Sequence, residues 1–589
     1  MPRFTFIFVI ICFFACHDDQ DMMMNEDPIE SIAYCDQEEL EVALIGYIQE
    51  QILLLNVFED SINTCLLFDS GQLLKICNEI ILMNRFDDNE NKLYLQLLDS
   101  TEFVISGPDS NPEIEILVDP FNRNPLCAKV NLTSNTDLKV TANIYSKDYN
   151  SIDMTTSYEI KTAHEISILG LFQDHNNMVE LIYATPFDNL IDIDTLFIQT
   201  DKVNIEPYIE VIEKQEEKMA KGSFHLISSL SRRPVVPYAI DHNGEIRWIL
   251  DYSKHESLNE WYYDVGIEFL SNGNLYFGDK STSKIYEIDW FGEILNTWDM
   301  PGYSFHHNVI EKPNANFLVT VNKPEEVHLN GKFTVEDHII EIDRSTGQIV
   351  KEWDFKDILD ENRDVLEIFV IGNYIDWLHL NSVWYDESDN SIVVSGRNQC
   401  VLKVDYEDNI KWIFGNHSGW GENRKGQDCN QFLLTPVNQE GVPYPQDLKD
   451  GYENIDEFEW SWYQHAVMLK PNGNLLLFDN GPFRNFDNSP NYSRAVEYKI
   501  DTDNMTVQQV WAYGKDRGAE CFAGIASDVD YYPVNNSVLF APGINIFNGS
   551  NNIGGRIVEL DYMTKEVLFD LIIVEPGITF HRVERFDFY

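Results

Sequence analysis

The feature that most constrains the fold is a repeat in the C-terminal part of the chain. In each unit an apolar residue precedes an Asp, a turn follows, and the next strand pattern usually carries a Trp. The units lie about 50 to 60 residues apart, except where an insertion at 415–459 lengthens one interval. Such repeats, each long enough for about four short strands, are typical of β-propellers. The repeated residues are Asp241, Asp289, Asp343, Asp405, Asp501 and Asp561.

Six units predict a six-bladed propeller over residues 206–589. A seventh blade stays open if the insertion hides one, although the insertion lacks the strand pattern. A second landmark recurs within the units. Turns of the Pro-Asn-x-Asn kind at 271–274, 313–316 and 471–474, with a looser form at 386–390, each precede an apolar strand pattern. Asn and Gly favour tight turns, so these are predicted hairpin turns inside blades.

The chain ahead of the propeller divides into two parts. Residues 16–100 have a roughly helical apolar period, with a predicted capping box at Asp36 and Glu39 and a second helical run at 70–86. Residues 101–205 alternate apolar and polar side chains in short runs, which predicts a small β-sandwich domain. The predicted fold class is therefore all-β: a six-bladed β-propeller preceded by a β-sandwich and an N-terminal helical segment.

The first residues resemble an export signal. Arg3 precedes an apolar run at 4–15, which fits the core of a signal peptide and is too short to span a bilayer. We therefore expect residues 1–15 to be a signal peptide. Cys16 follows a small residue and precedes an acidic run, which resembles a bacterial lipoprotein cleavage site and predicts lipidation at Cys16. The expected location is exported, as a periplasmic or cell-surface lipoprotein, with plain secretion as the alternative.

The charge balance narrows the partners. The chain has 42 Lys and Arg against 98 Asp and Glu, a net charge of -56. Nucleic-acid phosphates would be repelled by such a surface, so we expect no nucleic-acid partner. A local cationic pocket can still hold a small anion. Membrane contact is expected only through the lipid anchor, and a homodimer is left open.

Three histidines share one position relative to the hairpin turns. His307 lies six residues before the turn that starts at Pro313, and His465 lies six before the turn at Pro471. His379 lies seven residues before the looser turn. Histidine is only 14 of 589 residues, so three in one register point to a shared role. Equivalent positions of successive blades converge on the axis, and we expect these imidazoles to face one funnel.

Arg397 follows an apolar strand pattern after His379, where its charge requires an anionic partner. Three histidines could hold zinc, but a nearby arginine repels a cation and the zinc-enzyme motifs are missing from the sequence. A tetrahedral oxyanion fits better, because cationic donors stabilise the transition state of its transfer and a neutral imidazole can be the nucleophile. We therefore expect neither a metal nor another cofactor.

Several motifs resemble the bacterial arylsulfate sulfotransferase family. They are Asp376-Trp-Leu-His-Leu-Asn-Ser382, Ser395-Gly-Arg397, Gln464-His465-Ala466 and Phe478-Asp-Asn-Gly481. The segment 164–175 is similar to the family's N-terminal β-sandwich. The resemblance covers about 105–589. It implies a two-step transfer of a sulfuryl group from an aryl sulfate donor to a phenol acceptor, independent of PAPS.

The resemblance also implies roles for residues. His465 matches the nucleophile that forms a sulfohistidine, and His379 and Arg397 match other catalytic residues. Either of the pair His306 and His307 matches a sulfate-binding histidine, and the register selects His307. The remaining substrate-binding candidates are His306 and Asn381.

The sequence departs from the family at Asn308, where Asp is usual, and at Ala315, where Gly is usual. Only Cys429 lies in the insertion, which puts the family's disulfide there in doubt. The alternative function is a non-catalytic surface propeller that binds sulfated or glycosylated ligands. A reactive histidine opposite an arginine favours the enzyme, because a pure binder has no use for it.

Overall fold

The computed structural model of the chain describes residues 112–589, apart from 185–189, 220–222, 231–232, 263–264, 366–367, 488–491, 545–553 and 575–579. Before residue 112 it describes the backbone of five short strands. These are β1 (Leu53–Leu55), β2 (Leu73–Ile76), β3 (Ile80–Met83), β4 (Leu93–Leu97) and β5 (Phe103–Ser106). The predicted signal peptide, Cys16 and the predicted capping box lie outside the described residues.

The helical prediction for 16–100 is wrong for its second run, 70–86. There β2 and β3 pair as an antiparallel hairpin, and β1 takes the end of the first run. Four-residue stretches rich in Leu and Ile fit a strand and one face of a helix equally well. Periodicity over so few residues therefore could not separate the two.

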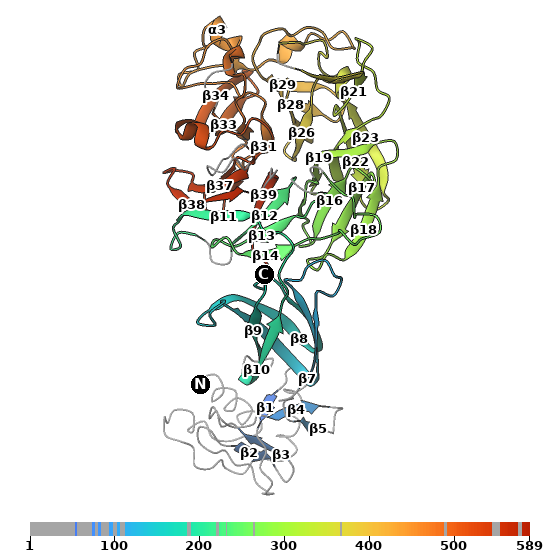
Figure 1. The fold of residues 1–589 in the computed structure, drawn as a ribbon, viewed down its shortest axis with the longest axis vertical. Helices are drawn as coiled ribbons and strands as arrows, with labels where there is room; N and C mark the ends of the chain where they lie inside the picture. Colours follow the sequence, from blue (N-terminus) through green and yellow to red (C-terminus); the bar gives the residue numbers. More distant parts are fainter. Residues whose placement is uncertain are drawn as a thin grey trace, which may run out of the picture.

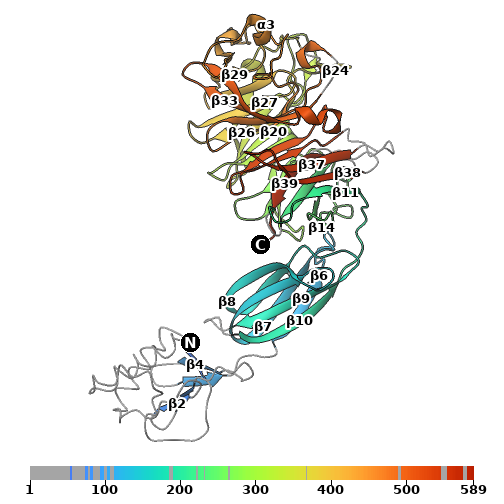
Figure 2. The same ribbon diagram turned by 90° about the vertical axis from the view of Figure 1, so that its left-hand side faces the viewer.

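A small all-β domain follows, made of one antiparallel sheet bent around a long hairpin (Figures 1 and 2). Strand β6 pairs with the first half of β7, β9 pairs with its second half, β10 pairs with β9, and β8 pairs with β7 along both halves. Alternate residues of β7 are fully buried, which forms the core of the domain. The bounds are β6 (Glu113–Val118), β7 (Ala128–Tyr145), β8 (Ile152–Ile168), β9 (Asn176–Ala184) and β10 (Leu190–Gln199).

The described residues from 208 onward form a propeller of antiparallel sheets around a common centre (Figure 1). Six of these sheets have four or five strands. The first three consist of β39 (Phe580–Phe586), β12 (Phe224–Ser229), β13 (Tyr238–Ile240) and β14 (Ile246–Ile249); β15 (Glu268–Phe269), β16 (Leu275–Asp279), β17 (Lys284–Ile288) and β18 (Ile294–Asp299); and β19 (Ser304–Glu311), β20 (Phe317–Asn322), β22 (His338–Asp343) and β23 (Gln348–Asp354).

The other three sheets complete the ring. They consist of β26 (Leu380–Asp386), β27 (Ser391–Gly396), β28 (Cys400–Asp405) and β29 (Ile410–Phe414); β31 (His465–Leu469), β32 (Leu475–Asp479), β33 (Arg494–Asp501), β34 (Thr506–Tyr513) and β30 (Thr435–Pro436); and β35 (Asp528–Tyr532), β36 (Ser537–Ala541), β37 (Gly554–Asp561), β38 (Val567–Val574) and β11 (Tyr208–Lys214). The insertion carries a short helix, α3 (Gln446–Lys449), and a 3-10 turn (Cys429–Phe432). Within the described residues, no helix combines the length and apolarity needed to cross a membrane.

The repeated Asp residues occupy equivalent turns, as predicted. Each ends the third strand of its sheet or directly follows it, and each precedes the fourth. The carboxylate explains the choice of residue, because it accepts backbone N–H groups that the turn leaves unpaired. Asp289 Oδ1 accepts from Phe291 N at 3.0 Å and Glu293 N at 2.8 Å, and Asp405 Oδ1 does the same for Glu407 and Asn409.

Both ends of the propeller region close the ring. The final strand, β39, pairs with β12 in the first sheet, and β11 pairs with β38 in the last sheet. Each of these two sheets therefore combines strands from opposite ends of the chain, and red and green ribbons lie side by side there in Figure 1. This pairing places β39, with His581, beside the central cavity of the propeller.

Candidate functional site

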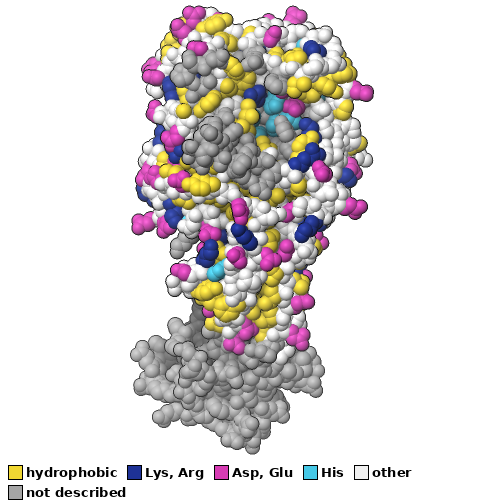
Figure 3. All heavy atoms as spheres, viewed as in Figure 1, with side chains coloured by type: hydrophobic (Ala, Val, Ile, Leu, Met, Phe, Trp, Pro, Cys, Tyr) yellow, Lys and Arg dark blue, Asp and Glu magenta, His cyan; other side chains and the backbone are white. Residues whose placement is uncertain are grey.

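A cavity of about 590 Å³ opens at the centre of the propeller. Figure 3 shows histidine side chains in a hollow on this face of the molecule. The structure thus brings together the residues that the sequence register predicted. The cavity is lined by Leu230, His307, Val335, Glu336, Ile371, Tyr374, Asp376, His379, Arg397, His465, Ile525, Ala526 and His581.

The inner strands present the histidines at irregular positions. In β19 the pairing with β20 shifts around His307, whose φ is 59°. His379 has a φ of 57° just ahead of β26, and in β31 the pairing shifts beyond His465, where Ala466 has a φ of 51°. A bulge re-aims the side chain it carries, and positive φ is costly for residues other than Gly. The same irregularity in three sheets directs three imidazoles to one centre.

His465 is buried, with its tautomer set by a neighbour. Its Nδ1 lies 2.7 Å from Asn480 Oδ1, and Asn480 Nδ2 donates to the carbonyls of Ala523 and Ala526 at 2.8 and 3.0 Å. An amide oxygen held this way can only accept, so Nδ1 carries the proton and Nε2 keeps the lone pair. Burial, aided by neighbouring cationic groups, holds the pKa of His465 well below its usual value. The ring is therefore neutral and nucleophilic.

His379, in contrast to His465, is protonated and positively charged. Its Nδ1 lies 2.7 Å from both Asp376 Oδ2 and Glu336 Oε2. Burial lowers the pKa of His379, but the two carboxylates outweigh it and raise the pKa to about 10. The imidazolium Nε2–H then donates to His307 Nε2 at 3.2 Å. His379 is thus a proton donor at the cavity.

Arg397 supplies the second positive charge. It sits in the turn between β27 and β28, and its backbone N donates to His379 O at 2.9 Å. Its guanidinium lies 4.9 Å from the centre of the Tyr463 ring, and Nη1 donates to Asn398 Oδ1 at 3.1 Å. A planar guanidinium oriented by a stacked ring suits recognition of an oxyanion.

Two predicted residues lie behind the cavity rather than in it. His306 is buried, its Nε2 lies 2.5 Å from Glu336 Oε1, and its ring packs edge-on against that of His307, with centroids 3.8 Å apart. Asn381 is also buried, and its Nδ2 donates to Gln464 O at 2.8 Å. Asn381 therefore holds the strand that carries His465. The register selected His307 from the pair, and His307 is the one that lines the cavity.

Four residues of the site were not singled out from the sequence. His581 stacks on His307 with ring centroids 4.8 Å apart. It was missed because β39 is the final strand, so no hairpin turn follows from which to count back. Asp376 and Asn480 lie within the motifs quoted above, and the three-residue spacing from Asp376 to His379 was the available signal. Glu336 comes from the connection between β20 and β22 and had no sequence signal.

The charges in the cavity favour an anion over a metal ion. Glu336 belongs to two groups whose ligand atoms lie within 4.8 Å of one another, one with His306 and His307 and one with Asp376 and His379. Glu336 already contacts ring nitrogens of His306 and His379, so a metal ion there would compete with the protons on those nitrogens. The ion would also be repelled by Arg397, which lines the same cavity. An oxyanion instead meets two cationic donors.

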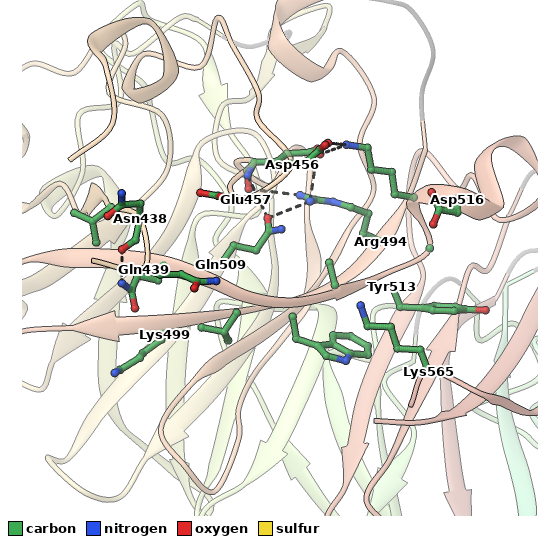
Figure 4. Close-up of a pocket in the computed structure, with 18 of the residues that line it drawn as sticks. Asn438, Gln439, Asp456, Glu457, Arg494, Lys499, Gln509, Tyr513, Asp516 and Lys565 are labelled. Carbon is green, nitrogen blue, oxygen red and sulfur yellow. Dashed lines mark hydrogen bonds and ion pairs between the residues drawn. The ribbon is translucent and has the colours of Figure 1, made fainter. Parts of the chain in front are cut away.

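A second cavity, of about 770 Å³, lies beside β34 and the insertion (Figure 4). No histidine is among its described lining residues. Its polar groups bind one another: Arg494 Nη1 donates to Gln509 Oε1 at 3.2 Å, and Gln508 Nε2 donates to Asn438 O at 2.6 Å. The reactive groups therefore gather in the central cavity.

Comparisons with known proteins agree with this geometry. The family described as Arylsulfotransferase (ASST) matches residues 209–575, and the Arylsulfotransferase Ig-like domain matches 115–201. The curated arylsulfate sulfotransferase AssT of Escherichia coli O6:H1 is 28% identical over 563 residues, covering 79% of this chain and 91% of that protein. The protein of that name from Lelliottia amnigena is 28% identical over 558 residues, with the same coverage.

Among solved structures, a streptogramin B lyase aligns with 12% identity and a TM-score of 0.26, covering 63% of this chain and 98% of that one. A similarity that low carries no argument by itself. The family match alone spans more than half of the chain and includes every histidine of the cavity except His581. The chain therefore belongs to the arylsulfotransferase family.

Proposed function

We propose that this protein transfers a sulfuryl group from an aryl sulfate ester to a phenol through a sulfohistidine at His465. The observation that carries the proposal is the buried, neutral His465, whose Nε2 lone pair is available in a cavity with Arg397 and protonated His379. The names of the two bacterial relatives support the substrate class.

In the first step His465 Nε2 attacks the sulfur atom. The N–S bond forms and the bond from sulfur to the aryl oxygen breaks, while Arg397 stabilises the charge on the sulfuryl oxygens. The departing phenolate takes the proton from His379 Nε2. The pKa of His379, about 10, matches that of a phenol, also about 10, so this transfer is close to balanced.

The second step reverses these roles. The acceptor phenol gives its proton to His379 and attacks the sulfur, the N–S bond breaks, and His465 returns to its neutral form. Glu336 and Asp376 hold His379 in the same orientation while its charge changes. His379 therefore gives its proton to the leaving phenolate in the first step and regains one from the acceptor phenol in the second.

The test is incubation with 4-nitrophenyl sulfate, with and without phenol. Without phenol we expect release of one equivalent of 4-nitrophenol per protein, because His465 is then blocked. Adding phenol should produce continuous release and phenyl sulfate. Absence of 4-nitrophenol release under both conditions would contradict the proposal and favour a propeller that only binds sulfated ligands.

We also propose that the protein is exported and anchored by lipid at Cys16. The support is the apolar run at 4–15 and the residues around Cys16. Cys16→Ser should shift the protein from the membrane fraction to the soluble exported fraction, measured by fractionation and immunoblotting. Membrane association equal to that of the wild type would contradict the anchor.

A further inference from the structure

A small sheet outside the six large ones carries much of the cavity wall. Strand β21 (Phe333–Thr334) pairs parallel to β25 (Tyr374–Asp376), and β25 pairs antiparallel to β24 (Phe369–Ile371). The strands of this small sheet, together with the residues directly after β21, contribute five of the residues that line the central cavity. These are Val335, Glu336, Ile371, Tyr374 and Asp376.

The outer part of this wall is apolar and exposed. Ile371 and Tyr374 are direct partners across the β24–β25 hairpin, so they share one face. Their exposed fractions are 64% and 53%, and Ile525, another lining residue, is 45% exposed. The Tyr374 ring also packs against Phe333, with centroids 5.7 Å apart, which holds it in place. Exposed apolar side chains at the mouth of a cavity with a few charged groups are typical of a ligand contact.

The inner part of the same wall controls the proton donor. Asp376 ends β25, two residues after Tyr374, and Glu336 follows Val335 directly after β21. Both carboxylates lie 2.7 Å from His379 Nδ1. One sheet thus presents apolar side chains to the opening and acidic side chains to His379.

We propose that the cavity-facing side of the β21–β25–β24 sheet is the aryl-recognition element of the site. The aromatic ring of donor and acceptor lies against Ile371 and Tyr374, with the sulfuryl group directed toward Arg397 and His465. A ring held there is also beside the strands that orient His379, so recognition of the ring and placement of the proton depend on one element. This inference rests on the proposed sulfuryl transfer and adds the source of its preference for aryl esters.

The experiment compares Tyr374→Ala and Ile371→Ala with Val370→Ala. Val370 is 50% exposed and lies on the same strand as Ile371, but it pairs with Ile375 on the other face and does not line the cavity. With phenyl sulfate as donor, each cavity variant should raise KM about 5- to 10-fold. The rise should be larger with 2-naphthyl sulfate, while kcat stays within about 2-fold because neither side chain touches the reacting atoms.

Binding of 2-naphthol, followed by its fluorescence in the same variants, gives a readout that needs no turnover. Affinity should fall in Tyr374→Ala and Ile371→Ala and stay unchanged in Val370→Ala. If the wild type releases phenol from an aryl sulfate and all three variants keep its KM and affinity, the inference is overturned. Equal losses in all three would overturn it too. A wild type without turnover would instead contradict the proposed function.

Discussion

His465→Asn should carry no sulfuryl group after addition of 4-nitrophenyl sulfate without acceptor, whereas the wild-type protein should gain one. The asparagine amide offers no nitrogen lone pair of comparable nucleophilicity, so the N–S bond has no atom from which to form. Asn480 would keep its hydrogen bonds to Ala523 and Ala526, which limits the disturbance to the substituted ring. Intact mass spectrometry after mixing measures the added group directly.

The matched control is His255→Asn, because His255 lies outside the cavity lining and packs beside Tyr252. It should label like the wild type. Thermal unfolding of both variants checks that they are folded. Labelling of His465→Asn at the wild-type level would move the nucleophile to His379 or His307, the other two imidazoles of the register.

Arg397→Lys should still label at His465, but about 100- to 1000-fold more slowly. Lysine keeps the positive charge and loses the planar pair of N–H donors that Tyr463 helps to orient. Loss of one well-placed donor to a developing oxyanion typically costs a factor of this size. The labelling rate, measured by acid quench and intact mass, reports this step apart from transfer to the acceptor.

Arg344→Lys serves as the control for that substitution. Arg344 pairs with Glu311 and Glu287 and does not line the central cavity. Its variant should label at the wild-type rate. A rate within about 3-fold of wild type in Arg397→Lys would show that the guanidinium does not hold the transferred group.

Much of this site could be predicted from sequence because a propeller repeats its geometry. The hairpin turns mark an equivalent position in each sheet, and counting back six residues from them identified His307 and His465 from the sequence. Both line the central cavity. His379 fell one residue off that count, yet it lines the same cavity and has nearly the same φ as His307, 57° against 59°. The Asp residues were equally readable, since each has a local task in its own turn.

The other features of the site depend on contacts between residues far apart in the sequence, which no local sequence pattern indicates. Glu336 reaches His379 from the connection between β20 and β22, and only the folded chain shows that the two meet. Asn381 lies in a motif that suggested substrate binding, yet its side-chain amide donates a hydrogen bond to the backbone carbonyl of Gln464. The segment 70–86 shows the limit of periodicity, because short apolar runs gave a helical reading to what is a hairpin.

The closing strand β39 links the wall of the cavity to closure of the propeller ring. His581 is among the final residues and stacks on His307 only when β39 has paired with β12. A molecule in which β39 has not paired with β12 contains His465 but lacks the His581 side of its cavity. Closure of the ring and assembly of the four imidazoles around the cavity, those of His307, His379, His465 and His581, are therefore one event.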